Sequence, residues 1–221
     1  MKQKHRLKLM GKKVGMTTVF DEQGRNIPCT VLHVEPNVIT QLKTVETDGY
    51  EAVKLGHEKI AGKNQKKIQA KVTKPLYEDY KKKNIESRRR LKESRISTEG
   101  YELGQELDLS YFENEKHVDI QGVSKGKGYQ GLMKLHNFKG GPAAHGSGFH
   151  RHAGSTGMRS TPGRCFPGGP RPSRMGGRTH TLQSLKVISI HKEKNLLLVK
   201  GAVPGTRGSL VYLSKAIKKG L

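Results

Sequence analysis

The sequence predicts a mainly β protein with some α-structure: a β-barrel core that carries a basic, partly helical insertion and a long irregular internal arm. Two observations lead to this fold class. Both ends of the chain contain short runs that alternate apolar and polar side chains and are separated by turn residues, as strands do. Between these ends, residues 122–181 hold fifteen of the 27 glycines and no acidic residue. Such a segment is unsuited to a regular helix or sheet.

The composition limits the partners that the chain can have. The net charge of +23 comes from 42 lysines and arginines against 19 aspartates and glutamates, and apolar residues make up only 33%. A charge of this size is self-repulsive in isolation and favourable beside a polyanion. No apolar run approaches the roughly 18 residues that span a bilayer, and MKQKHRLKLMGKK lacks the apolar stretch of a secretion signal. We therefore expect nucleic acid rather than membrane as partner.

Residues 1–62 form the N-terminal part of the expected β-rich core. Strand patterns occur at MTTVF (16–20), IPCTVLHV (27–34), VITQLKTV (38–45) and YEAVKL (50–55), and turns are expected at DEQGRN and ETDG. Cys29 falls in one of these strands, and the second cysteine, Cys165, falls in the arm. The different contexts of these cysteines favour a reduced, cytoplasmic protein. The short spacing of the strands favours a small closed barrel.

Residues 63–95 are expected to form a basic, partly helical insertion. Between Lys66 and Arg95 there are twelve lysines or arginines and four acids. Pro75 can open a helix, and the pairs Glu78/Lys82, Asp79/Lys83 and Glu86/Arg90 have helical spacing. A run of this kind is most often a solvated helix surface, but three consecutive arginines favour a surface that faces phosphates. The candidate residues are Arg88, Arg89 and Arg90.

Two further segments complete the core. Residues 96–121 are expected to supply core strands, because KHVDIQGVS (116–124) alternates apolar and polar side chains. Residues 182–221 are the C-terminal part of the barrel, with strand patterns at LKVISI, LLLVKG and SLVYL, and turns at HKEKN and AVPGTRG.

The arm, residues 122–181, is predicted to bind folded RNA. Glycine allows close approach of the backbone, arginine binds phosphate with two donors and stacks on bases, and histidine stacks on unpaired bases. Without acids, no point along the arm repels phosphate. Duplex DNA would more naturally receive a recognition helix, and none is evident. The candidate RNA-binding residues are Lys125, Lys127, Lys134, Lys139, His145, His150, Arg151, His152, Arg159, Arg164, Arg171, Arg174 and Arg178.

Two other interpretations of the arm are weaker. GKGYQG (126–131) matches the dinucleotide pattern G-x-G-x-x-G, but that site also needs an acidic residue about 20 positions later. Here the next acid after Asp119 is Glu193. His145, His150, His152, His180 and Cys165 could supply zinc ligands, but they lack a C-x-x-C pair and a helical H-x-x-x-H. We expect no metal, no cofactor, no small-molecule substrate and no enzymatic activity.

The chain resembles the universal large-subunit ribosomal protein L-three family in its bacterial form. The resemblance rests on SKGKGYQG, HGSGFHRHAGSTGMRSTPGR and NLLLVKGAVPG, on the opening MGKKVGMTTVFDEQGRNIPCTV, and on TDGYEAVKLG and VTKP. It covers nearly the whole chain in order, although residues 63–95 match poorly beyond VTKP. Ser160 stands where some members carry a methylated glutamine, and arginines replace lysines in CFPGGPRPSRMGG.

The resemblance implies a barrel of the translation-factor type in a cytoplasmic, ribosome-bound protein. It implies that the chain binds 23S-type ribosomal RNA, contacts neighbouring large-subunit proteins, assists early assembly and extends its arm towards the peptidyl transferase centre. The family motifs carry over to Lys125, Lys127, Gly128, His145, His150, Arg151, Gly154, Ser155, Gly157, Thr161, Pro162 and Gly163. The alternative is another basic architectural protein that binds nucleic acid.

Overall fold

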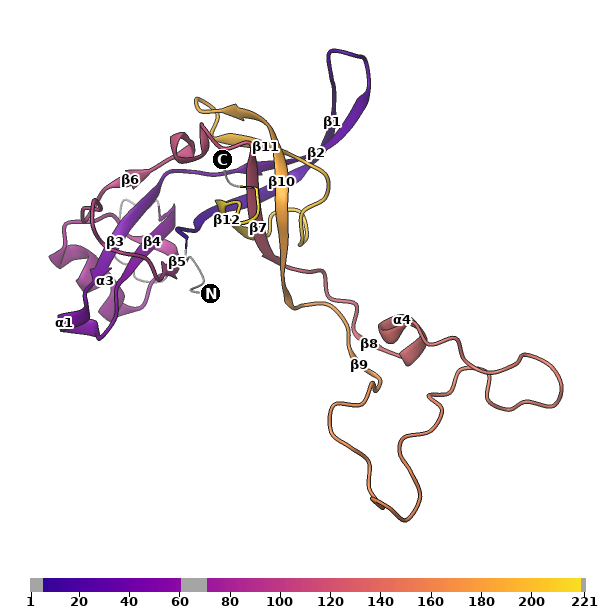
Figure 1. Cartoon of the computed structure of the whole chain (residues 1–221). Coiled ribbons are helices and arrows are strands. Elements are labelled where there is room, and N and C mark those ends of the chain that lie inside the picture. Colours follow the sequence, from indigo (N-terminus) through magenta and orange to yellow (C-terminus); the bar gives the residue numbers. More distant parts are fainter. Residues whose placement is uncertain (1–5, 61–70, 220–221) are drawn as a thin grey trace. The chain divides into compact units, whose positions relative to one another are not determined.

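The computed structural model describes residues 6–60 and 71–219. The chain divides into two compact units (Figure 1). The first, here called the main unit, comprises Met1–Val123 and Thr179–Leu221, and the second, the internal unit, comprises Ser124–Arg178. Residues 63–70 of the expected insertion lie outside the described residues.

The main unit contains a closed barrel with the strand order β1-β12-β7-β10-β11-β2. Its neighbouring strands are antiparallel throughout. The expected β-rich class with a closed barrel is therefore confirmed. The barrel strands are β1 (Leu9–Phe20), β2 (Asn26–His33), β7 (His117–Val123), β10 (Thr179–His191), β11 (Leu196–Lys200) and β12 (Leu210–Lys215).

The main unit also contains a four-stranded sheet with the order β5-β4-β3-β6, and its strands are labelled in Figure 1. Its strands are β3 (Asn37–Lys43), β4 (Ala52–Lys59), β5 (Arg88–Ser94) and β6 (Glu106–Leu107). Among the described residues, the helix α1 (Val45–Asp48) connects β3 to β4, and α3 (Lys74–Lys82) lies between β4 and β5. The 3-10 helix η1 (Leu109–Phe112) lies between β6 and the barrel strand β7. As expected, Pro75 lies in the first turn of α3 and Asp79 pairs with Lys83 at 2.8 Å.

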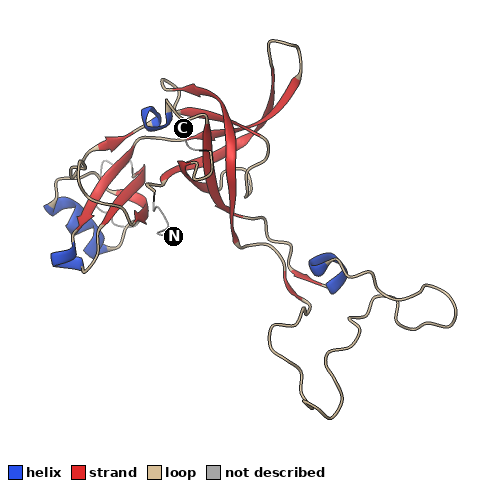
Figure 2. Cartoon of the chain, viewed as in Figure 1, coloured by secondary structure: helices blue, strands red, loops and turns tan. Residues whose placement is uncertain are grey.

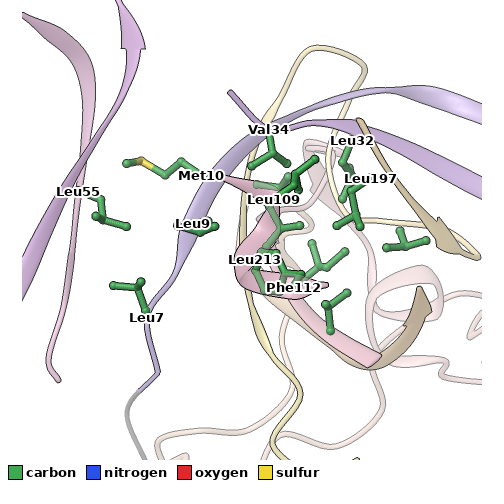
Figure 3. Packing of buried hydrophobic residues seen from close by; sticks show 14 of the residues in the cluster. Leu7, Leu9, Met10, Leu32, Val34, Leu55, Leu109, Phe112, Leu197 and Leu213 are labelled. Carbon is green, nitrogen blue, oxygen red and sulfur yellow. The ribbon is translucent and has the colours of Figure 1, made fainter. Parts of the chain in front are cut away.

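One apolar core joins the barrel and the sheet. Leu9 on β1 faces Leu213 on β12, and Leu213 in turn faces Ile120 on β7, so that the three fully buried side chains form a row across the barrel. Leu7, Met10 and Leu55 continue the same cluster between barrel and sheet (Figure 3). Full burial of each such side chain stabilises the folded state by about 1.5–3 kcal/mol relative to leaving it exposed.

Some elements differ from the sequence expectation. β1 begins at Leu9 rather than Met16, because residues 9–12 pair with β12. Glycine is required at position 11, since a Cβ there would lie 2.7 Å from Val34 Cγ2. The expected turn ETDG is mostly the helix α1, which ends at Gly49 with φ 78°. Glu86 and Arg90 do not share a helix, because Arg90 lies on strand β5.

The internal unit is mostly loop (Figure 2). Its regular elements are β8 (Tyr129–Gln130), the five-residue helix α4 (Leu132–His136) and β9 (Ser173–Arg174). β8 and β9 pair in antiparallel register, and the N–H of Lys127 donates to the carbonyl of Met175 at 2.9 Å. Gly176 is required here, because a Cβ at this position would lie 2.0 Å from the carbonyl oxygen of Lys125.

Candidate nucleic-acid interface

The internal unit presents positive charge without any internal compensation. All ten of its lysines and arginines are exposed, from Lys125 to Arg178. Because the unit holds no acidic residue, none of these cations can form an ion pair within it. His145, His150 and His152 are exposed as well. The predicted residues therefore share one chemical character, namely accessible donors for an anionic partner.

The root of the unit is held by backbone hydrogen bonds. The N–H of Ser124 donates to the carbonyl of Arg178 at 2.9 Å, and the N–H of Met175 donates to the carbonyl of Gly128 at 2.9 Å. Gly128 has φ 69°, a left-handed conformation that favours glycine. The sequence motif around Lys125, Lys127 and Gly128 thus builds the closed base of the unit.

A second closed loop lies between Gly140 and His150. The N–H of Gly141 donates to the carbonyl of Phe149 at 3.1 Å, and Nδ1 of His150 donates to the carbonyl of Pro142 at 3.0 Å. A Cβ on Gly140 would lie 2.2 Å from the carbonyl oxygen of His150, so this crossing requires glycine. The loop presents His145 at its surface with φ 61°.

Aromatic and apolar side chains are exposed between the cations. Phe149 lies beside His152 with ring centroids 5.1 Å apart, and the guanidinium of Arg164 lies 5.9 Å from the Phe166 ring centroid. Tyr129 and Met158 are each 74% exposed. Exposed rings beside cations are suited to stacking on unpaired bases. Composition indicated a basic surface, but only the structure shows these particular pairs.

The thiol of Cys165 in the internal unit interacts with Thr156 and Arg171. A hydrogen bond with Thr156 and then the Arg171 guanidinium hold the pKa of the exposed Cys165 thiol below its usual value. Cys29 is buried in the main unit, and burial raises the pKa of its thiol. The two cysteines therefore differ in exposure and in the direction in which their surroundings shift the thiol pKa.

The three arginines at 88–90 do not form one phosphate-facing surface. The Arg88 side chain is only 7% exposed and its Nη2 lies 3.6 Å from Glu86 and 3.7 Å from Glu106. It is buried because Gly56 on the neighbouring strand leaves room for its aliphatic stem: a Cβ on Gly56 would lie 2.8 Å from Arg88 Cγ. Arg89 and Arg90 are exposed, and their partner is Glu58 at 3.5 and 3.9 Å. Arg88 is thus buried, whereas Arg89 and Arg90 are exposed candidates for phosphate contact.

Within the described part of the chain, no group of three or more His, Cys, Asp or Glu side chains gathers in a way that could hold a metal ion. In residues 6–60 and 71–219, no helix is long and apolar enough to cross a bilayer.

Comparison with known proteins identifies relatives of this chain. The family model described as ribosomal protein L3 matches residues 96–195. Large ribosomal subunit protein uL3 of Protochlamydia amoebophila is 56% identical over 213 residues, which cover 96% of this chain and 91% of the relative. The chain belongs to the ribosomal protein L3 family. Large ribosomal subunit protein uL3 of Chlamydia felis is 52% identical to this chain, over residues that cover 95% of this chain and 96% of the relative.

Family membership confirms the resemblance seen in the sequence. The chain is a structural constituent of the large ribosomal subunit and is not an enzyme. It functions in the ribosome, in the cytoplasm, in assembly with ribosomal RNA and other ribosomal proteins.

Proposed function

We propose that the chain binds 23S-type ribosomal RNA through the arm, residues 122–181, assists an early step of large-subunit assembly, and extends the arm towards the peptidyl transferase centre. RNA performs the chemistry there, and the chain supplies contacts to it. The main unit, with residues 1–62, 96–121 and 182–221 as its core segments, serves as the folded base from which both ends of the arm begin.

The observation that carries this proposal is the accessible, acid-free charge of the internal unit. Ten exposed cations stand between Lys125 and Arg178 with no carboxylate to compete for them. Each phosphate that they neutralise releases counterions, so binding gains free energy mainly at low salt. The exposed rings of Phe149 and Phe166 add contacts that suit unpaired bases more than a base-paired duplex.

The same geometry supports a role in an early step of assembly. Most of the internal unit is loop with exposed side chains, and it cannot bury a core of its own. Such a segment gains order from the surface that it contacts. A segment that inserts among RNA helices has to be in place before those helices close around it, which favours binding early in assembly. The direction towards the peptidyl transferase centre rests on the family resemblance.

The test is to measure binding of the full chain to large-subunit ribosomal RNA between about 50 and 200 mM salt, with duplex DNA as competitor. We expect affinity to fall steeply with salt and duplex DNA to compete weakly. Equal competition by duplex DNA would instead support a general architectural protein. Indifference of the affinity to salt would contradict the role assigned to the exposed cations.

A further inference from the structure

A cavity of about 500 Å³ opens within the internal unit. It is lined by His136 at the end of α4, by Gly168, Gly169 and Pro170, and by Arg171, Ser173 and Arg178. Pockets of about 300–1,000 Å³ are the size that holds small organic ligands, and this one is open to solvent, since His136, Arg171 and Arg178 in its lining are exposed. This one is therefore larger than a single phosphate requires and large enough for a nucleoside with its phosphate.

The walls of the cavity are positioned by hydrogen bonds. Nε2 of His136 donates to the carbonyl of Arg171 at 3.3 Å, which ties the end of α4 to the opposite wall. Ser173 lies on β9, where it pairs with Gln130 of β8. The cavity is thus lined mainly by residues 168–173, with His136 of α4 and Arg178 completing it.

The chemistry of the lining points to a nucleotide. Arg171 and Arg178 bring two guanidinium groups to the cavity, and the internal unit has no acid to neutralise them. A guanidinium binds phosphate with two parallel donors. Gly168, Gly169 and Pro170 leave an uncharged wall without long side chains, and the imidazole of His136 offers a flat face. Such surfaces accept an unstacked base.

We propose that this cavity holds one unpaired nucleotide of the bound RNA, with its phosphate at Arg171 and Arg178 and its base against Gly168–Pro170 and His136. The inference rests on the proposed RNA binding and adds a specific recognition site to it. A free nucleotide has the same chemistry, so the experiment separates the two sources. RNA is favoured because the cations of the cavity are continuous in sequence with exposed cations outside it, at Arg164 and Arg174.

The structure offers a variant that fills the cavity without changing charge. Gly169 has no left-handed backbone constraint, and the nearest atom to a Cβ there is the Phe166 carbonyl oxygen at 4.0 Å. Gly169→Leu should therefore fold and occupy the cavity. Gly148→Leu is the matched control, because Gly148 lies in the other loop with nothing within 4 Å of its Cβ. A second pair compares Arg171→Gln/Arg178→Gln with Arg159→Gln/Arg164→Gln, which remove equal charge.

The experiment measures binding of each full-length variant to large-subunit ribosomal RNA at one salt concentration, together with chemical reactivity of the unpaired nucleotides. We expect Gly169→Leu to bind about tenfold more weakly than Gly148→Leu, as loss of a base-stacking contact predicts. The double variant at Arg171 and Arg178 should weaken binding more than its control. In the wild-type complex one unpaired nucleotide should be protected, and both cavity variants should expose it.

A parallel measurement adds the four nucleoside monophosphates and inorganic phosphate to the free chain. Saturable binding of a free monophosphate, with no nucleotide protected in the RNA complex, would show that the cavity binds a free nucleotide and not a nucleotide of the RNA. If the wild-type chain binds RNA and the cavity variants match their controls, the cavity assignment is wrong while the proposed function stands. If the wild-type chain fails to bind RNA, the proposed function itself fails and the cavity assignment with it.

Discussion

The carboxylate of Asp119 on β7 accepts a hydrogen bond of 2.7 Å from the backbone N–H of Ser184 on β10. Ser184 has φ 56° and lies in the bulge of β10 between Leu182 and Leu185. The second carboxylate oxygen of Asp119 accepts from the N–H of Ile217 at 3.1 Å. One buried carboxylate therefore accepts hydrogen bonds from the bulge of β10 and from the segment that follows β12.

Asp119→Ala should destabilise the main unit by about 2–4 kcal/mol, because it leaves two N–H groups without their acceptor. Asp119→Asn retains one acceptor oxygen and should cost less. The measurement is the free energy of unfolding from urea titration, with the exposed Glu22→Ala as control. Equal stability of the alanine variant and the control would show that the bulge does not depend on Asp119.

The arginine run can be divided by burial. Arg88→Ala should lower the free energy of unfolding by about 1–3 kcal/mol, since it removes a buried side chain that packs over Gly56. Arg89→Ala/Arg90→Ala should change it by less than about 1 kcal/mol, because exposed ion pairs contribute little. Of these variants, the exposed pair should weaken RNA binding. A larger loss of RNA affinity in folded Arg88→Ala would contradict this division.

His57 should make the stability of the main unit depend on pH. Its side chain is fully buried, neither ring nitrogen has a hydrogen-bond partner among the described residues, and burial lowers its pKa in the folded state. The unfolded chain therefore takes up the proton first as pH falls. The stability due to the neutral ring is present above the unfolded pKa of about 6.5 and is lost as pH falls below it towards the folded pKa.

His57→Leu should remove this component, so that the unfolding free energy of the variant falls less between about pH 7 and pH 5 than that of the wild type. The control His191→Gln, at an exposed histidine, should show the same fall in unfolding free energy as the wild type. Parallel pH profiles for wild type and His57→Leu would show that the ring does not titrate on unfolding.

Two adjacent glycines at the base of the internal unit allow the effect of a steric clash to be measured apart from the effect of a left-handed backbone conformation. Gly176 and Gly177 both have positive φ, 73° and 65°, but only a Cβ on Gly176 meets the backbone of Lys125. Gly177→Ala should cost about 1 kcal/mol of backbone strain, whereas Gly176→Ala should also separate β8 from β9. We expect faster tryptic cleavage at Lys125 and Lys127 in Gly176→Ala, with the thermal midpoint of the main unit unchanged in both variants. Equal cleavage rates would contradict the close approach.

Arg151→Ala should affect function more than assembly if the arm reaches the peptidyl transferase centre. Arg151 is exposed in the internal unit, outside the apolar core, so folding should change little. Loss of one contact to RNA costs about 1–3 kcal/mol, which the remaining basic residues tolerate. Purified subunits should contain the variant at normal occupancy and show altered single-turnover peptide transfer.

Subunits that carry Arg89→Ala/Arg90→Ala are the control, with weaker incorporation expected and normal transfer once the protein is bound. Normal transfer with Arg151→Ala, together with impaired transfer in the control at full occupancy, would refute the direction assigned to the arm.

The strands β2, β11 and β12 could be located from the sequence because runs of β-branched and apolar residues there are bounded by turn residues. Along β11 and the start of β12, buried and half-buried side chains alternate. β1 and β10 extend beyond their patterns. The expected strand began at Met16, yet the barrel places the preceding residues GKKVG in a strand beside β12 and β2. The burial of Arg88 could not be predicted from the sequence for a related reason, since only the position of Gly56 across the sheet makes space for its side chain.

By itself, the sequence determined the β-rich class and the separation of an acid-free, glycine-rich segment from the strands, because composition and local periodicity are properties of consecutive residues. Its motifs also carried the resemblance to the family. Only the tertiary structure decided that Asp119 holds a bulge in another strand, that Arg88 is buried while Arg89 and Arg90 are not, and that His136, Arg171 and Arg178 line one cavity. These arrangements depend on which distant segments pack together, and no local pattern records the space that a neighbouring strand or loop leaves.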